Sequence, residues 1–141
     1  MIKVEELVPL LQEALGENRD FKMPVRGTSM LPFIREGDAV MLTKPENLKK
    51  HDILFYRRTD GHYVLHRIFQ VKKEFYVLMG DNQTQKEQPI YPSQAIAKVK
   101  AVVREGEVRP LKGFSYRCYL FFWQFRIVRK LMFPVTRRCA K

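Results

Sequence analysis

Hydrophobic and polar positions change period near the start of the chain, from a helical pattern to one typical of strands. Over the first sixteen residues, acidic side chains alternate with apolar ones at Val4, Leu7, Val8, Leu11 and Leu15. A glycine, Gly16, follows the last of them. This spacing predicts an amphipathic helix that buries one face and ends at the glycine.

Short apolar runs separated by turn residues follow this helix. They predict strands at residues 21–25, 39–42, 53–56, 63–71, 75–79 and 97–104. The turn at residues 59–61 joins the third and fourth runs as a hairpin. Closely spaced strands without long helices between them favour a mainly β fold, with a coiled or barrel-like antiparallel sheet.

Residues 114–133 combine aromatic and basic side chains. The apolar positions include Tyr116, Tyr119, Trp123, Phe125 and Phe133, and the cations include Arg117, Arg126 and Arg129. Each cation costs about 2.5–3.5 kcal/mol at the centre of a bilayer, which disfavours a membrane-crossing helix. The pattern fits a helix in a membrane interface, and equally one packed on the sheet or on a second copy of the chain, so a homo-oligomer stays open. We therefore divide the chain into a domain at 1–110 and a helical extension at 111–141.

The charge of the chain is strongly positive, at +11 for 141 residues. Its basic pairs are scattered, as at residues 49–50, 57–58, 72–73 and 137–138. Attraction to anionic lipid, to an acidic peptide or to nucleic acid would each account for this charge. Only one short predicted helix precedes residue 29, so there is no helix-turn-helix there, and specific nucleic-acid binding is disfavoured.

Several classes of site and location are disfavoured by composition. Cys118 and Cys139 are too few for a disulfide framework, and His51, His62 and His66 do not form a ligand motif, so we expect no cofactor and no metal. The acidic first helix lacks the basic start and long apolar run of a signal peptide. We expect a cytoplasmic protein or one bound peripherally to a membrane.

Ser29 and His66 are the candidate nucleophile and base. Ser29 lies in a turn of small residues with the sequence GTSMLP at 27–32. A serine hydroxyl needs an adjacent base, and histidine titrates in the range best suited to that task. His66 sits in the predicted strand at 63–71, which would hold its ring at a fixed position. The alternative is an ordinary polar residue on a half-exposed strand.

Five segments in this order resemble the serine peptidases that include type I signal peptidases and LexA-like repressors. They are residues 27–38, 51–56, 66–68, 79–82 and 95–102, and the resemblance spans about residues 23–107. It implies a coiled β fold with an open cleft, and a peptide or protein substrate. At the position of His66, bacterial signal peptidases and the repressors carry lysine. The chain is therefore similar to the histidine-type branch found in archaea and the endoplasmic reticulum.

The resemblance leaves two acids open as the partner of His66. Asp81 lies in the segment at 79–82, whereas Glu87 falls where histidine-type signal peptidases place the third member of their triad, usually an aspartate. A turn role is the alternative for Asp81, because Gly-Asp-Asn is strong loop chemistry. We expect Asp81 to shape the loop and Glu87 to touch His66.

Residues around the nucleophile are candidates for binding the oxyanion and the substrate. The N–H of Ser29 is the natural first oxyanion donor, and Thr28 is the candidate for a second. Met30 and Pro32 would line a substrate pocket, or else belong to the core. We expect a serine endopeptidase that cleaves a leader or signal segment through an acyl-enzyme. The alternative is a non-catalytic module of the same fold that binds peptides.

Overall fold

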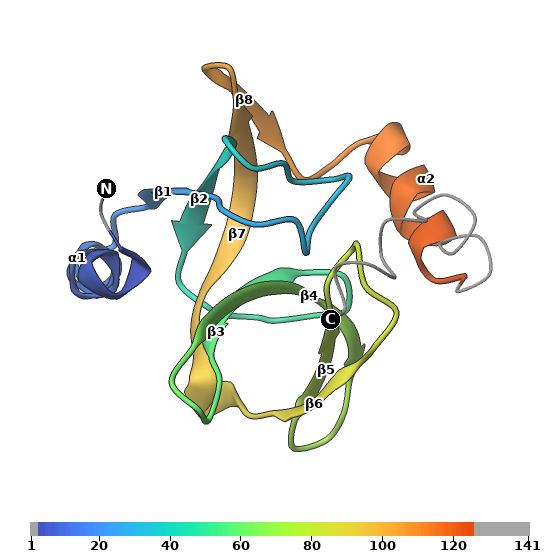
Figure 1. Cartoon of the computed structure of the whole chain (residues 1–141), viewed down its shortest axis with the longest axis horizontal. Helices are drawn as coiled ribbons and strands as arrows, with labels where there is room; N and C mark the ends of the chain where they lie inside the picture. The colour runs from blue at the N-terminus through green and yellow to red at the C-terminus, as the bar shows by residue number, and fades with distance from the viewer. Residues whose placement is uncertain (1–2, 126–141) are drawn as a thin grey trace.

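The computed structural model describes residues 3–125, which form one antiparallel sheet between two helices (Figure 1). The first helix is α1 (Val4–Gly16) and the last is α2 (Phe114–Trp123). The strands are β1 (Phe21–Pro24), β2 (Ala39–Thr43), β3 (Ile53–Arg57), β4 (Tyr63–Val71), β5 (Tyr76–Met79), β6 (Glu87–Ile90), β7 (Ala95–Arg104) and β8 (Glu107–Pro110), with a short 3-10 helix at Pro92–Gln94. This arrangement confirms the predicted mainly β fold class.

The long strand β7 joins the two halves of the sheet. The strand order is β1-β2-β7-β3-β4-β5-β6, and β8 also pairs with β7. The first half of β7 pairs with β3, and its second half lies between β2 and β8. Figure 1 shows β3, β4, β5 and β6 curling around one end of β7, while β1, β2 and β8 lie at its other end.

Two apolar clusters form on opposite faces of the central strands. In β3, Ile53 and Phe55 face a cluster covered by α1, whereas Leu54 and Tyr56 face a cluster enclosed by the curled strands. Successive side chains of a strand point to opposite faces, so both faces of β3 are buried. Its continuous apolar sequence, ILFYR with only the arginine exposed, follows from this position.

The first helix has the predicted position and buried face. Val8, Leu11 and Leu15 are buried together with Ala14, and they pack on the first of the two clusters. Glu5 and Glu6 stand in the first turn, where the helix dipole favours negative charge.

The predicted strands are all present, with ends that shift by up to two residues, but two strands were missed. Both β6 and β8 are four residues long and contain a proline, Pro89 and Pro110 respectively. Every residue of β8 is exposed, and β6 lies at the end of the sheet. Within a sheet, proline is confined to such edge positions. These short segments also lack the apolar–polar alternation from which strands are predicted.

The second helix occupies part of the predicted aromatic segment, since residues 126–133 lie outside the described part of the chain. Its residues Tyr116 and Tyr119 contact the sheet through Arg67 and Asp81. One face is therefore packed on the body of the protein. Within residues 3–125, neither helix has the length and hydropathy needed to span a membrane. The division at residue 110 stays a prediction.

Candidate active site

Ser29 lies in the loop between β1 and β2, and backbone hydrogen bonds close the base of this loop. Val25 donates its N–H to the carbonyl of Asp38 at 2.8 Å. Inside the loop, Ile34 donates its N–H to the carbonyl of Met30 at 2.9 Å, and both side chains are buried in the core under α1. The loop is thus anchored on both sides of Ser29, which is half-buried.

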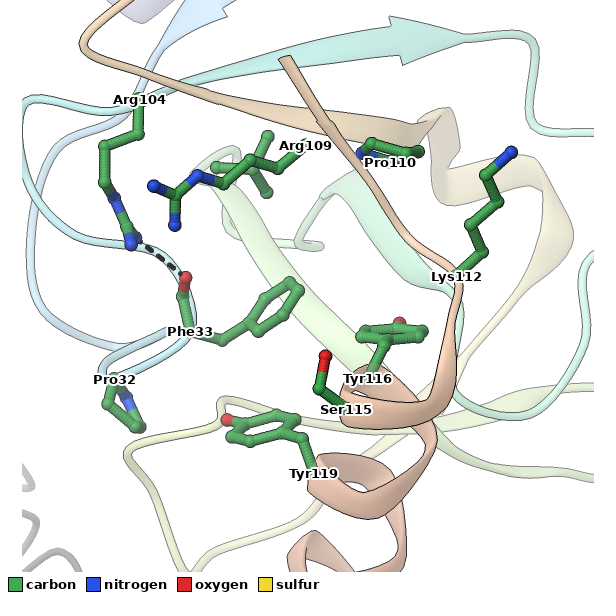
Figure 2. Close-up of a pocket in the computed structure, with 10 residues that line it drawn as sticks. Pro32, Phe33, Arg104, Arg109, Pro110, Lys112, Ser115, Tyr116 and Tyr119 are labelled. Atoms are coloured by element: carbon green, nitrogen blue, oxygen red, sulfur yellow. Dashed lines mark hydrogen bonds between the residues drawn. The ribbon is translucent and has the colours of Figure 1, made fainter. Parts of the chain in front are cut away.

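A carboxylate fixes the second half of the same loop. Asp38 accepts the N–H of Arg35 at 2.9 Å and a hydrogen bond from the Arg104 guanidinium at 2.7 Å. Arg104 also donates to the carbonyl of Phe33 at 3.1 Å, the bond drawn in Figure 2. The hydrogen bond from Arg104 lowers the pKa of Asp38, so this carboxylate stays charged at neutral pH.

The turn after β5 holds Ser29 directly. Asn82 donates its backbone N–H to the carbonyl of Ser29 at 2.9 Å, and its side-chain amide donates to the carbonyl of Thr28 at 3.1 Å. A Cβ atom at Gly80 would lie 2.6 Å from the Ser29 carbonyl oxygen. Such an approach is closer than carbon and oxygen atoms allow, so only glycine fits there.

His66 lies on β4 beside the same turn. Its neighbour Arg67 pairs with Met79, so continuation of the antiparallel register places His66 across from Gly80. Ser29 and His66 therefore both adjoin Gly80, one through the loop and the other through the sheet. The ring of His66 is 3% exposed and points into the cluster enclosed by the curled strands, with its Nδ1 atom 3.3 Å from the Tyr56 hydroxyl.

Glu87 is the acid that lies nearest this ring. Its Oε1 atom is 3.9 Å from His66 Nδ1 and accepts a hydrogen bond of 2.9 Å from the Tyr56 hydroxyl. Arg58 donates to both carboxylate oxygens of Glu87, at 2.9 Å and 3.0 Å. The acid is thus held between a cation and a phenol, at the first residue of β6.

Burial sets the protonation states in this group. Loss of solvent, together with the charge of Arg58, lowers the pKa of His66 to about 4, against the opposing influence of Glu87 and Asp81. The ring is therefore neutral at pH 7, which is the form that accepts a proton. Burial and the Glu87 carboxylate raise the pKa of Tyr56 above its ordinary value, so the phenol keeps its hydrogen.

Asp81 makes a different set of contacts. Its carboxylate accepts two hydrogen bonds from Arg67, at 2.9 Å and 3.0 Å, and one of 2.7 Å from the Tyr119 hydroxyl. Neither Asp81 nor Arg67 is exposed. Burial opposes the charge on Arg67, but the adjacent Asp81 carboxylate outweighs it, and the pKa of Arg67 is raised.

Aromatic rings surround the Arg67 guanidinium. They belong to Phe33 of the nucleophile loop and to Tyr116, Tyr119 and Trp123 of α2, with centroids at 5.0–5.7 Å. Arg67 also donates to the Tyr116 hydroxyl at 2.7 Å. Because adjacent residues of a strand face opposite ways, His66 points into the curled sheet while Arg67 points toward α2.

A family model described as Peptidase S24-like matches residues 2–103 of the chain. The chain belongs to the peptidase S24-like family. No curated protein matched the chain in a second comparison. Ser29, His66, Asp81 and Glu87 all fall within the matched S24-like domain, whereas α2 lies beyond it. Membership supports a serine peptidase of the superfamily that includes LexA and the signal peptidases.

The other predicted site residues of this S24-like domain lie in different surroundings. Met30 is buried in the core under α1, whereas Pro32 is exposed. Thr28 is exposed and adjoins the nucleophile, with its carbonyl bound to Asn82. Roles for these residues in binding the oxyanion or the substrate stay predictions.

A basic cavity of about 340 Å³ opens beside the nucleophile loop (Figure 2). Pro32 and Phe33 of the loop form one side, and α2 contributes Tyr116 and Tyr119. Figure 2 shows the guanidinium of Arg109 on the side opposite α2, close to that of Arg104. Lys112 adds a third cation to the rim. The protein thus presents a concave surface with basic side chains beside the loop that carries Ser29, and most of its lining lies beyond the matched residues 2–103.

The remaining histidines and the described cysteine do not contact Ser29 or His66 through the hydrogen bonds described above, although Arg67 donates to the His51 carbonyl at 2.9 Å. His62 is exposed in the β3–β4 turn beside Asp60, and His51 packs edge-on against Trp123. Cys118 has a free thiol, and Cys139 lies outside the described residues. Across residues 3–125, no cluster of three or more His, Cys, Asp or Glu side chains could hold a metal ion.

Two residues of the His66 group were missed from the sequence. Tyr56 read as an ordinary apolar position of β3, and Arg58 as part of a scattered basic pair. Both reach Glu87 only because β4 and β5 place β6 opposite β3 in the curled sheet. No local pattern carries that information.

Proposed function

We propose that this S24-like protein is a serine endopeptidase of the histidine type, with Ser29 as nucleophile and His66 as general base. Its substrate is a peptide or protein from which a leader or signal segment is removed. The observation that carries the proposal is that the Ser29 loop closely approaches Gly80 and that the register of β4 and β5 brings His66, with a neutral, buried imidazole, to the same turn.

The chemistry proceeds in two balanced steps. Ser29 Oγ attacks the peptide carbonyl carbon while His66 takes the hydroxyl proton, and the backbone N–H of Ser29 stabilises the oxyanion. The tetrahedral intermediate breaks the C–N bond, and His66 returns its proton to the departing amine. Water then attacks the ester carbonyl while His66 takes its proton. The acid product leaves, and His66 returns the proton to the Ser29 oxygen.

Separate roles follow for the two acids. Glu87 supports His66, because it is the carboxylate of the His66 group. Asp81 is committed to Arg67 and Tyr119, and it shapes the turn that holds Ser29. This division supports assignment to the histidine-type branch, in which an acid following the Gly80 turn completes the site.

The basic cavity beside the loop that carries Ser29 favours a substrate with acidic or aromatic side chains. Phe33, Tyr116 and Tyr119 offer ring faces, and Arg109 with Lys112 offers positive charge. Electrostatic attraction of this kind raises the rate at which such a peptide is captured.

Attachment to a membrane surface is the second part of the proposal. Phe114, Phe121, Phe122 and Phe125 are exposed at α2, in contrast to Tyr116, Tyr119 and Trp123, which contact the Arg67 group. Exposed aromatic rings on a strongly cationic protein suit the interface of an anionic bilayer. This attachment would bring the site to membrane-bound substrates.

A peptide-binding module without catalysis is the second candidate function. It is favoured by the burial of His66, whose ring is only 3% exposed and contacts Tyr56. A base so enclosed would serve a peptidase only through its edge nearest Ser29. In the binding module, an extended peptide would bind beside Ser29 and dissociate without being cleaved.

Reaction with a fluorophosphonate separates these functions. We expect intact mass spectrometry to show one adduct on the wild-type protein, lost in Ser29→Ala and in His66→Ala. Ser93→Ala and His62→Ala are the matched controls, because both residues are exposed and lie outside the site. Absence of an adduct on the wild type, with and without anionic vesicles, would contradict the peptidase. Retention of the adduct in Ser29→Ala would contradict the assignment of the nucleophile.

A further inference from the structure

The Tyr56 hydroxyl lies between the base and the acid of the proposed site. It is 3.3 Å from His66 Nδ1 and 2.9 Å from Glu87 Oε1, whereas these two atoms are 3.9 Å apart. A separation of 3.9 Å is too long for a hydrogen bond. The phenol is therefore the group through which the imidazole and the carboxylate are connected.

Counting hydrogens gives the direction of each bond. A phenol hydroxyl has one hydrogen to donate, and a carboxylate can only accept hydrogen bonds. Since the Tyr56 hydroxyl donates to Glu87, its oxygen is left to accept from His66, and Nδ1 must carry the hydrogen. In a neutral ring only one nitrogen is protonated, so Nε2 then has a free lone pair.

The surroundings hold this chain of groups in place. Tyr56 is fully buried in the cluster enclosed by the curled strands, and it comes from β3, next to His66 on β4. Two hydrogen bonds from Arg58 fix the carboxylate of Glu87. The phenol cannot rotate away from both partners without losing a buried hydrogen bond.

We propose that Tyr56 is a positioning residue that couples Glu87 to His66, fixes the Nδ1–H tautomer and leaves Nε2 as the base. The inference rests on the proposed peptidase function and deepens it. When His66 accepts the Ser29 proton, Nδ1–H stays bonded to the phenol oxygen, and the phenol hydrogen stays in its hydrogen bond to the Glu87 carboxylate. The Glu87 carboxylate thus stabilises the imidazolium through the Tyr56 hydroxyl, which takes the place of a direct hydrogen bond between the acid and the imidazole.

A purely structural role for Tyr56 makes a different prediction. If the residue only fills the core, Tyr56→Phe would preserve the ring and leave the tautomer of His66 unchanged. Tyr76→Phe is the matched control, because Tyr76 packs against the same cluster but pairs with Val71, the last residue of β4, five residues from His66. The tautomer is therefore the readout that separates the two roles.

Nitrogen-15 NMR of the imidazole at pH 7 provides this readout, with the His66 signals assigned by their loss in His66→Gln. We expect wild-type His66 to be protonated at Nδ1 and unprotonated at Nε2. In Tyr56→Phe, the Nε2–H form should increase, whereas Tyr76→Phe should match the wild type. A wild-type ring protonated at Nε2 would overturn the proposal, even if Tyr56→Phe failed to fold.

Adduct formation by the fluorophosphonate gives the kinetic test. We expect Tyr56→Phe to slow adduct formation at pH 7 by at least about tenfold, which is part of the roughly 100-fold to 10,000-fold that a positioned general base contributes. Tyr76→Phe should react at the wild-type rate. An unchanged rate in folded Tyr56→Phe would overturn the coupling. If the wild type forms no adduct at all, the peptidase proposal fails, whereas the tautomer measurement still decides the role of Tyr56.

Discussion

Arg67 and Asp81 form a two-pronged ion pair in which neither side chain is exposed to solvent. The pair lies on the face of β4 opposite to His66, and it binds the hydroxyls of Tyr116 and Tyr119 from α2. It therefore ties three segments together: the turn that holds Ser29, the strand that carries His66 and the second helix. The relative positions of Ser29 and His66 therefore depend on this buried contact.

Removal of one member of this pair should strongly destabilise the protein. Asp81→Asn and Arg67→Met each leave a buried polar group without its partner, which costs about 3–5 kcal/mol for pairs of this kind. The free energy of urea unfolding measures the loss. Because the pair is coupled, the double variant should lose clearly less than the sum of the two single variants.

The exposed pair of Arg19 and Glu17 is the control for this experiment. Its side chains are 61% and 55% exposed, and such pairs contribute about 0–1 kcal/mol. Glu17→Gln should therefore leave the free energy of unfolding almost unchanged. If Asp81→Asn lowered the free energy of unfolding no more than Glu17→Gln does, the buried pair would not contribute to folding stability as expected.

The sequence predicted those parts of the fold and site that depend on local pattern. The alternation at residues 63–71 became β4, and the small-residue turn at 27–32 became the loop that presents Ser29. Strand β6 was missed because its proline and its short, exposed edge remove the alternation. The position of Glu87 beside His66 was expected only from the family resemblance, since the register of β5 and β6 sets it.

The pair of Arg67 and Asp81 shows why the rest was not predicted. Arg67 follows His66 directly, and alternation on a strand sends the two side chains into different environments. The aromatic residues of α2 indicated a membrane-binding or packing surface. Nothing in them showed that an arginine forty-nine residues earlier donates a hydrogen bond to the Tyr116 hydroxyl. Contacts of this separation depend on the path of the sheet and leave no local signal.

The pH dependence of stability should report on the burial of His66. Burial lowers its folded pKa from 6.5 to about 4, so protonation favours the unfolded chain. The stabilisation is full above pH 6.5 and is lost as the pH falls toward 4, by about 3 kcal/mol in total. Urea unfolding from pH 8 to pH 3 measures it.

His66→Gln isolates this contribution, because glutamine does not titrate in that range. We expect the difference in unfolding free energy between wild type and variant to change between pH 6.5 and pH 4, and to be level outside this window. A difference that stays constant across the whole range would show that the folded protein does not lower the pKa of His66.

Substitution of Gly80 should displace Ser29, the proposed nucleophile. In Gly80→Ala the new methyl group meets the backbone oxygen of Ser29 at 2.6 Å, so the loop must move. We expect a loss of about 1–3 kcal/mol in stability, typical of an overpacked site. We also expect at least a tenfold slower reaction with the fluorophosphonate, since small misplacements of reacting groups cost up to about 100-fold.

Gly16→Ala provides the matched glycine control. A Cβ atom there has nothing within 4 Å, and Gly16 is the last residue of α1. We expect unchanged reactivity and a stability equal to or slightly above that of the wild type. Full reactivity in Gly80→Ala would show that the Ser29 loop does not need its contact with the β5 turn.

The exposed aromatic face of α2 should determine binding to lipid. Phe121 and Phe122 are 57% and 49% exposed, so serine at both positions removes apolar area without opening the core. Burial of each half-exposed ring is worth about 1 kcal/mol, and the double variant should bind anionic vesicles about tenfold or more weakly. Sedimentation with vesicles containing phosphatidylglycerol, against pure phosphatidylcholine, measures the binding.

Leu10→Ser is the control for this substitution, because Leu10 is 53% exposed on α1, which lies at the opposite end of the molecule from α2 (Figure 1). It should bind vesicles as the wild type does. Equal binding by the double phenylalanine variant would exclude this face as the lipid contact. Sedimentation equilibrium of the same proteins would then test the remaining occupant, a second copy of the chain, through a wild-type dimer that the variant does not form.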